Sequence, residues 1–358
     1  MIQYIIRRLI MVLPVMIGIL LVTFVIVRAI PGDPCYAMLG EKATEAQCNL
    51  FRQRFGLDKS VPEQFFRYVL NVVQGDLGET IRDRRAVLDV ISERLPLTME
   101  LTLLAMTFAS IVGVTFGVIA ALNRNSFWDV FTMIGANIGV SMPVFWLGLL
   151  LAYVFALLLR GTPFYIPPSG RFTPGVSLIP LATTWGLQDW TGLPRFLLNL
   201  VSNSAFLNGI LTGNWTLFRD AVWHLILPAT AVGTISMAVI ARMTRSSLLD
   251  VLGQDYIRTA RAKGLKERFV ITKHALRNAL IPIVTIIGIQ TGGLLSGAVL
   301  TETIFSLPGV GSRMVEAILA RDYPVVQGFS IFIALIFVFT NLIVDISYAY
   351  LDPRIRLE

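Results

Sequence analysis

The stretch LIMVLPVMIGILLVTFVIVRAI (residues 9–30) decides the fold of this chain, because it contains a single charged residue, Arg28. An α-helix needs about 20 consecutive apolar residues to cross the hydrocarbon core of a membrane. Two arginines, Arg7 and Arg8, precede the stretch, as they would in a signal peptide. The apolar run is longer than a signal peptide requires, and IPGDP (residues 30–34) offers no cleavage site of small residues. We therefore predict an uncleaved first transmembrane helix.

Five further stretches are long and apolar enough to span a membrane. With the first, the predicted spans are Leu9–Ile30, Leu101–Leu122, Val130–Leu159, Ala221–Ala241, Asn278–Thr301 and Pro324–Val344. Of the 358 residues 55% are hydrophobic and 15% are charged, with a mean hydropathy of +0.69. Soluble domains carry about 25% charged residues, so a soluble globular protein is disfavoured. The sequence predicts an all-α, multi-pass protein of the cell membrane (inner or plasma membrane) with six transmembrane helices.

One more stretch, Phe196–Phe218, has no charged side chain apart from its flanks. Several amides interrupt its apolar face, among them Asn199, Asn203 and Asn208. Each amide buried in lipid would need a hydrogen-bonding partner. We therefore expect a helix in or just outside the membrane interface instead of a seventh span.

The connection between the fourth and fifth spans is short and strongly basic. Its Lys and Arg residues are Arg242, Arg245, Arg258, Arg261, Lys263, Lys266, Arg268, Lys273 and Arg277. Basic loops of this length stay in the cytoplasm, so six spans place both termini there as well. We divide the chain into 1–30 (N-terminus and first span), 31–100 (an extracytoplasmic loop) and 101–358 (a five-helix core with the basic loop at 246–277). The net charge of +7 is then a consequence of topology and no sign of nucleic-acid binding.

Two cysteines, Cys35 and Cys48, lie in the predicted outer loop. An oxidising exterior permits a disulfide between them, which would stabilise the loop by about 3 kcal/mol. The alternative is two unrelated free thiols, and a separation of 13 residues does not decide between the two.

The sequence lacks the motifs of several kinds of chemistry. Two His and two Cys supply no zinc-type ligand set, and no metalloprotease or nucleophile-elbow motif is present. Gly292 and Gly297 have the spacing of a Walker A loop, but Ala298 and Val299 stand where its Lys and Ser or Thr are required. We expect a non-catalytic chain that binds no cofactor or metal, so that a partner must supply the energy of any pumping.

The predicted spans contain almost no charged residues, which disfavours an ion-coupled carrier. Arg28 lies near the end of the first span and Asp345 near the end of the last. Broken helices can bind ions through carbonyl groups alone, and Pro143, Pro228 and Pro282 lie in or near spans. A secondary carrier or channel that works without partners therefore remains an alternative.

Small residues inside the spans favour close helix packing. Gly113 and Gly117 form a Gly-x-x-x-Gly pair in the second span. In the glycine-rich fifth span, Gln290 and Thr291 are polar, and they either pack against a neighbouring helix or line a translocation path.

The basic loop is predicted to contain two short helices joined at a glycine. Residues 248–264 form a helix that Gly264 ends, because cations precede this glycine and glycine readily adopts left-handed backbone angles. A second helical run, Arg268 to Leu280, returns to the membrane. One interpretation is a basic loop that lies on anionic lipid headgroups.

The other interpretation rests on DYIRTARAKGL (residues 255–265) followed by HALRNALIP (residues 274–282). Together they resemble the EAA loop of ABC importer permeases, in the form typical of the dipeptide, oligopeptide and nickel branch. Ala260, Gly264 and Leu276 match the family pattern. The departures are Arg258 and Thr259 in place of Glu-Ala, His274 in place of Ile and Arg277 in place of Pro.

The resemblance extends over nearly the whole chain. It includes PGDP (31–34), GLD (56–58), GDLG (75–78), RSS (245–247), LTETIF (300–305), PG (308–309), RDYPVVQ (321–327) and DPRIR (352–356). In this order the stretches look like the first permease subunit of a dipeptide transporter.

The resemblance implies a type I importer permease fold and a coupling helix that docks on a cytoplasmic ATPase. The residues of this chain at the implied ATPase-coupling surface are Tyr256, Arg258, Thr259, Ala260, Arg261, Lys263, Gly264 and Leu265. It also implies a second permease subunit, two ABC ATPase subunits that bind ATP and Mg, an extracytoplasmic solute-binding protein and membrane lipid as partners. The implied cargo is a dipeptide or oligopeptide, with nickel chelate, glutathione or an oligosaccharide as alternatives.

Overall fold

In a computed structural model, the chain is described at residues 2–29, 33, 35–36, 40, 42–295 and 298–351. Within these residues the structure is almost entirely helical, and the β contact it contains is an isolated bridge between Glu79 and Ala86. The helical fold predicted from the sequence is confirmed.

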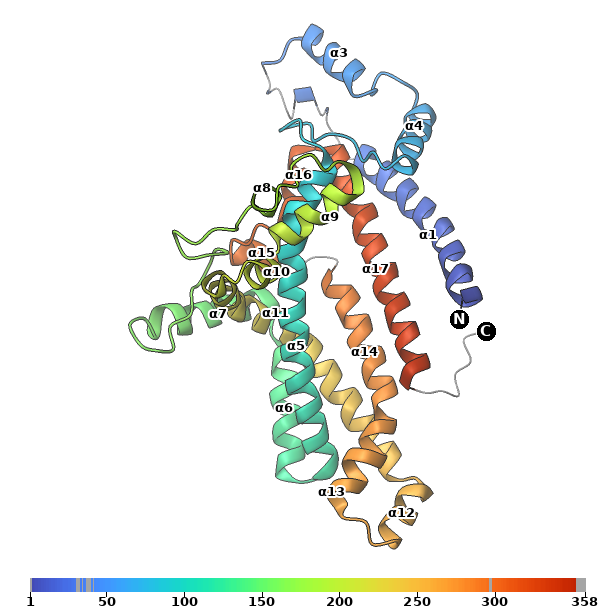
Figure 1. Cartoon of the computed structure of the whole chain (residues 1–358), viewed down its shortest axis with the longest axis vertical. Helices are drawn as coiled ribbons and strands as arrows, with labels where there is room; N and C mark the ends of the chain where they lie inside the picture. Colours follow the sequence, from blue (N-terminus) through green and yellow to red (C-terminus); the bar gives the residue numbers. More distant parts are fainter. Residues whose placement is uncertain are drawn as a thin grey trace.

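Five long helices have the length and apolarity of membrane spans. They are α1 (Ile2–Ala29), α5 (Val87–Leu122), α11 (Trp215–Leu252), α14 (Arg277–Leu295) and α17 (Tyr323–Leu351). All five are labelled in Figure 1, and each contains or overlaps a span predicted from the sequence. Most extend beyond the predicted bounds, and α5 begins at Val87, inside the segment that we had assigned to the outer loop up to residue 100.

The central pair is α5 and α11, which pack closely through small residues. A Cβ atom added at Gly113 or Gly117 would overlap with the backbone carbonyls of Met237 or Ala241 on α11. Two backbones can approach this closely only where one side chain is missing, so the predicted packing role of the Gly-x-x-x-Gly pair is confirmed.

The third predicted span, Val130–Leu159, is not one helix. It consists of α6 (Phe127–Ser141) and α7 (Val144–Ala152), which meet at an angle of 103°, followed by a π-helical turn, η1 (Tyr153–Leu158). The break lies at Met142 and Pro143, because proline lacks an N–H donor and disfavours helical angles in the residue before it. In Figure 1, α6 runs beside α5 and α7 turns away from it.

The fifth predicted span, Asn278–Thr301, also needs correction. Helix α14 ends at Leu295, and α15 (Val299–Ile304) is a separate short helix. At its other end α14 is preceded by α13 (Glu267–Phe269) and then by η2 (Val270–Leu276). The turns of η2 are π-helical and therefore wider than those of an α-helix. The predicted helical run Arg268 to Leu280 is therefore present, with a π-helical middle.

Residues 196–218 do not form one continuous helix, so the single helix expected at the membrane interface is divided into pieces. They fall on α9 (Gly192–Asn203), α10 (Ala205–Leu211) and the start of α11. Breaks at Ser204 and between residues 211 and 215 separate the pieces. A four-residue helix, α8 (Leu181–Thr184), lies close to α9.

The segment before α5 contains α3 (Glu45–Arg54) and α4 (Val61–Val73). Cys35 and Cys48 are joined in a disulfide with their Cα atoms 5.4 Å apart, so the first of the two alternatives for these cysteines is the one observed. Both cysteines are buried beside Phe51 and Ile81.

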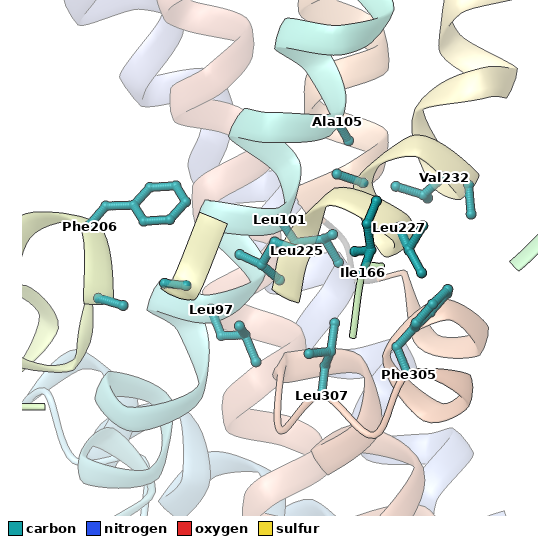
Figure 2. Close-up of a cluster of buried hydrophobic side chains, with 14 of the residues drawn as sticks. Leu97, Leu101, Ala105, Ile166, Phe206, Leu225, Leu227, Val232, Phe305 and Leu307 are labelled. Atoms are coloured by element: carbon teal, nitrogen blue, oxygen red, sulfur yellow. The ribbon is translucent and has the colours of Figure 1, made fainter. Parts of the chain in front are cut away.

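The main core joins the central helices to the segment that follows α14. Figure 2 shows Leu97 and Leu101 on α5, Leu225 on α11, and Phe305 and Leu307 in one cluster. The last two residues lie between α15 and α16 (Val310–Ala320), so this segment is packed against the central pair.

Candidate functional site

The basic connection (residues 253–276) joins α11 to α14 and contains α12 (Asp255–Ala262). In Figure 1 it forms the end of the molecule opposite to α3 and α4. Helix α11 continues to Leu252, so the predicted helix over residues 248–264 is divided at Gly253 and Gln254.

Helix α12 is fastened through its apolar side. Ile257 and Ala260 are buried in a cluster with Leu248 of α11, Ala121 of α5 and Ala279 of α14. A hydrogen bond from the Asn278 Nδ2 to the Tyr256 hydroxyl, 3.0 Å long, adds a polar contact to α14. Helix α12 thus has a fixed orientation relative to three long helices.

Gly264 forms the corner after α12. Its φ of +73° lies in the left-handed region, and the N–H of Leu265 donates to the Ala260 carbonyl across the corner (3.4 Å). This geometry is the left-handed glycine cap that the sequence predicted. Arg261 pairs with Glu267 at 2.6 Å, so one ion pair also bridges the two sides of the corner.

The side chains predicted to meet an ATPase lie mostly on the surface. The exposed ones are Tyr256, Arg258, Thr259, Arg261, Lys263, Gly264 and Leu265. Ala260 is buried, so it packs inside the cluster and does not belong to the exposed face. The connection contains six Lys or Arg residues and two acidic residues, which leaves an excess of four positive charges.

A cavity of about 760 Å³ lies beside α5, towards the other end of the molecule. Its wall is mainly apolar and comes from α5, α9, α10, α14 and the residue that joins α9 to α10. The α5 side chains that line it include Met99, Leu103, Thr107, Ser110 and Ile111, which share one face of that helix. Leu103 and Ile111 are 60% and 64% exposed, so the wall is open along this face.

The two polar residues singled out in the fifth span behave differently. Thr291 lines the cavity. Gln290 donates instead to the Ser236 hydroxyl at 3.1 Å and so links α14 to α11. Thr291 therefore faces the cavity, whereas Gln290 has a packing contact between two helices.

Glu100 lines the same cavity and was missed in the sequence, where it was assigned to the outer loop. Its carboxylate accepts hydrogen bonds from the Ser204 hydroxyl (2.7 Å) and the Phe206 N–H (3.1 Å), and it pairs with Arg171 at 3.4 Å. Arg171 also donates to the Asn203 carbonyl. Burial lowers the pKa of Arg171, and the Glu100 carboxylate opposes this shift. Glu100 thereby fixes the corner between α9 and α10 against the cavity.

A second buried acid, Glu302, organises the segment that we call the acid-centred connection (residues 298–322). Its carboxylate accepts from the Thr98 hydroxyl on α5 and from the Ser312 N–H, each at 2.8 Å. A Cβ atom at Gly309 would overlap with this carboxylate, so any other residue there would have to displace it. In the sequence, Glu302 stands out only as part of LTETIF (300–305), one of the stretches that resemble the permease family.

The described residues contain no group of three or more His, Cys, Asp or Glu side chains that could hold a metal ion. Another buried acid, Asp322, also joins distant parts of the chain, because it accepts a hydrogen bond from the Ile81 N–H at 3.2 Å. The two sites thus differ in character, one being an exposed basic helix and the other a mainly apolar cavity.

Comparison with known proteins agrees with these features. Residues 113–357 match the family described as the binding-protein-dependent transport system inner membrane component, and residues 1–102 match its N-terminal family. The chain is 44% identical to a dipeptide transport system permease protein of Alkalihalophilus pseudofirmus, over 99% of this chain and all of the relative. It is 45% identical to the dipeptide transport system permease protein of Escherichia coli K12, over 99% of both chains.

Another relative has a different cargo in its name. The glutathione transport system permease protein of Escherichia coli O6:H1 is 37% identical over the full length of both chains. The helices, the exposed basic connection and these full-length matches lead to one assignment: the chain belongs to the family of inner membrane components of binding-protein-dependent ABC transport systems, and it is a multi-pass inner membrane permease.

Proposed function

We propose that this chain forms half of the translocation path of an ATP-driven importer of dipeptides or oligopeptides. One observation carries the mechanical part of this proposal. Helix α12 shares one buried apolar cluster with residues of α5 and α14, and these same two helices line the cavity with Leu103, Thr107 and Thr291. A displacement of α12 by a partner would therefore be transmitted to the cavity wall.

The cargo is proposed from the relatives, since two of those compared are named dipeptide permeases. The mainly apolar wall with scattered hydroxyl groups suits peptides of varied side chains, because it contacts side chains without demanding one charge. Glutathione is the second candidate because a full-length relative carries it in its name, and glutathione is itself a small peptide.

The open face of the cavity is the reason to expect a second permease. Large apolar side chains such as Leu103 and Ile111 are exposed there, and a path for a peptide must be enclosed on all sides. A homologous subunit would supply the missing wall. An extracytoplasmic solute-binding protein would deliver the cargo, and two ABC ATPase subunits would bind ATP and Mg while this chain stays non-catalytic.

The proposed orientation places the basic connection in the cytoplasm, because its excess of positive charge favours that side. The first residues of α1 and the last residues of α17 point towards the end of the molecule that carries α12 (Figure 1). Both termini are then cytoplasmic, and α3 with its disulfide is outside, where disulfides persist.

The cargo is tested by reconstituting the copurified complex with its binding protein and measuring ATP hydrolysis. We expect stimulation by dipeptides or oligopeptides and none by nickel chelates or oligosaccharides. Stimulation by glutathione alone would reassign the cargo to the second candidate. Purification of this chain without ATPase or permease partners, with transport activity retained, would instead support a partner-independent carrier and contradict the proposal.

The coupling role of α12 is tested by Gly264→Asp, with Gly253→Asp as the matched control. Gly253 lies in the same connection at an ordinary helical φ of −78°, so a side chain is tolerated there. We expect Gly264→Asp to insert into the membrane normally and to lose substrate-stimulated ATP hydrolysis, while the control keeps it. Normal stimulation in Gly264→Asp would refute the coupling role.

A further inference from the structure

Helix α4 has more apolar surface than the rest of the chain covers. Four of its side chains, Phe65, Tyr68, Val69 and Val72, pack in part against the cluster that includes α1 and α17. Its hydrophilic side chains, Glu63, Gln64, Arg67 and Asn71, occupy another sector of the helix. Between these two sectors a third one remains, which is apolar and uncovered.

The uncovered sector is a stripe of Phe66, Leu70 and Val73. These side chains are 68%, 59% and 80% exposed, and their spacing of four and three residues puts them on one face. None of the residues of α4 is fully buried. An apolar stripe of this kind on a short amphipathic helix is unfavourable in water.

The attachment of α4 to α1 fixes its height relative to the membrane. Phe24 of α1 meets Phe65 with ring centroids 5.2 Å apart, and Arg28 donates to the Gln64 side-chain carbonyl at 2.8 Å and 3.0 Å. Phe24 lies five residues before the end of the apolar span Ile10–Ala29, which is about 8 Å along the helix axis. Helix α4 therefore lies beside the last turns of a transmembrane span.

The neighbouring surface of α1 faces lipid over the same turns. Leu21, Val22, Val25 and Ile26 are between 48% and 57% exposed and belong to a span. The stripe on α4 is therefore close to a lipid-facing surface, at the depth where acyl chains meet headgroups. Helices with one apolar and one hydrophilic side bind the membrane in that zone.

We propose that α4 lies in the surface of the lipid bilayer, on the side of the membrane where α1 ends, with Phe66, Leu70 and Val73 inserted among the lipids. The stripe holds the disulfide-closed segment around α3 at a constant height above the bilayer. The proposal requires only that α1 spans the membrane, so it stands or falls independently of the peptide cargo.

The test measures the environment of single nitroxide labels on α4. Cysteines replace Phe66, Leu70 or, as the matched control on the hydrophilic side, Asn71, in the complete complex reconstituted in phosphatidylethanolamine and phosphatidylglycerol bilayers. The native Cys35 and Cys48 are joined in the disulfide and do not react with the label. Power-saturation electron paramagnetic resonance then compares collisions with oxygen, which enriches in lipid, and with a water-soluble nickel chelate.

We expect labels at Phe66→Cys and Leu70→Cys to collide several-fold more with oxygen than with the nickel chelate, and the label at Asn71→Cys to show the reverse. Two outcomes would overturn the proposal. Equal preference for the nickel chelate at all three positions would place the stripe in water. Protection from both reagents at residues 66 and 70 would show that a protein, such as a second permease, covers it.

Discussion

The basic connection and the acid-centred connection are held in place in opposite ways, the first by buried apolar side chains and the second by a buried acid. Each joins two long helices, the first α11 to α14 and the second α14 to α17, and each contains a residue with positive φ. In the basic connection this residue is Gly264 at +73°, and the acid-centred connection has two, Ser306 at +51° and Arg321 at +55°. The basic connection turns its charges outward and buries Ile257, whereas the acid-centred connection turns Glu302 inward.

This difference decides which connection can serve another protein. Apolar packing leaves the hydrogen-bonding groups of Arg258 and Lys263 available at the surface, so a partner can contact them. The carboxylate of Glu302 accepts hydrogen bonds from Thr98 and Ser312 inside the protein, so it is not available to a partner. We infer that the basic connection is a docking surface for another protein. The acid-centred connection is fixed inside this protein and offers no such surface.

The largest expected effect is that of Glu302→Ala. It leaves the Thr98 hydroxyl and the Ser312 N–H without their acceptor in a buried space, which should cost about 3 kcal/mol of stability. Thermal unfolding of the purified complex measures this loss. The matched control is Thr303→Ala, because Thr303 is exposed and its hydroxyl donates to the carbonyl of Val299 in its own helix. If both variants unfolded alike, Glu302 would not organise its connection.

The next effect concerns the corner of the basic connection. Gly264→Ala forces a Cβ atom into left-handed backbone angles, which costs about 1–2 kcal/mol. No neighbouring atom lies within 4 Å of that Cβ, so the cost is purely conformational. Hydrogen exchange of the α12 amides should accelerate in Gly264→Ala and remain unchanged in Gly253→Ala. Equal protection in the two variants would mean that the corner does not hold α12.

The corner could be predicted from the sequence because its cause is local. Gly264 follows Arg261 and Lys263 directly, and a glycine after cations at a helix end is a cap by short-range physics. The same is true of the close approach at Gly113, which depends on a spacing of four residues.

The buried acids could not be predicted because their partners are distant in the chain. Ser204 lies 104 residues after Glu100, and Glu302 lies 204 residues after Thr98. The charged residues before the apolar run also made the start of α5 at Val87 unpredictable from the sequence. At that end α5 packs against α17, and this tertiary packing overrides the local polarity. The break at Pro143 was visible as a proline, but its angle of 103° depends on how α6 packs against α5 and how α7 packs against α11 and α15.

A smaller effect should separate the polar and apolar fastenings of α12. Tyr256→Phe removes the hydrogen bond with Asn278 and keeps the ring, so it should cost about 0.5–1.5 kcal/mol. A double-mutant cycle with Asn278→Ala, followed by hydrogen exchange of α12, isolates this contact. A coupling energy near zero would show that the apolar cluster around Ile257 holds α12 alone.

The smallest effect on stability, and the sharpest on docking, belongs to Arg261→Gln. The pair of Arg261 with Glu267 is about half exposed on both sides, and such surface pairs contribute less than about 1 kcal/mol. The variant should therefore unfold like the wild type. If the basic connection is a docking surface, the same variant should bind its ATPase partners more weakly, with less dependence on salt, because one positive charge is removed from the contact. Unchanged association at low salt would mean that the exposed charges determine only the orientation in the membrane. The basic connection and the connection around Glu302 would then differ in which side chains are buried, but not in their ability to dock a partner.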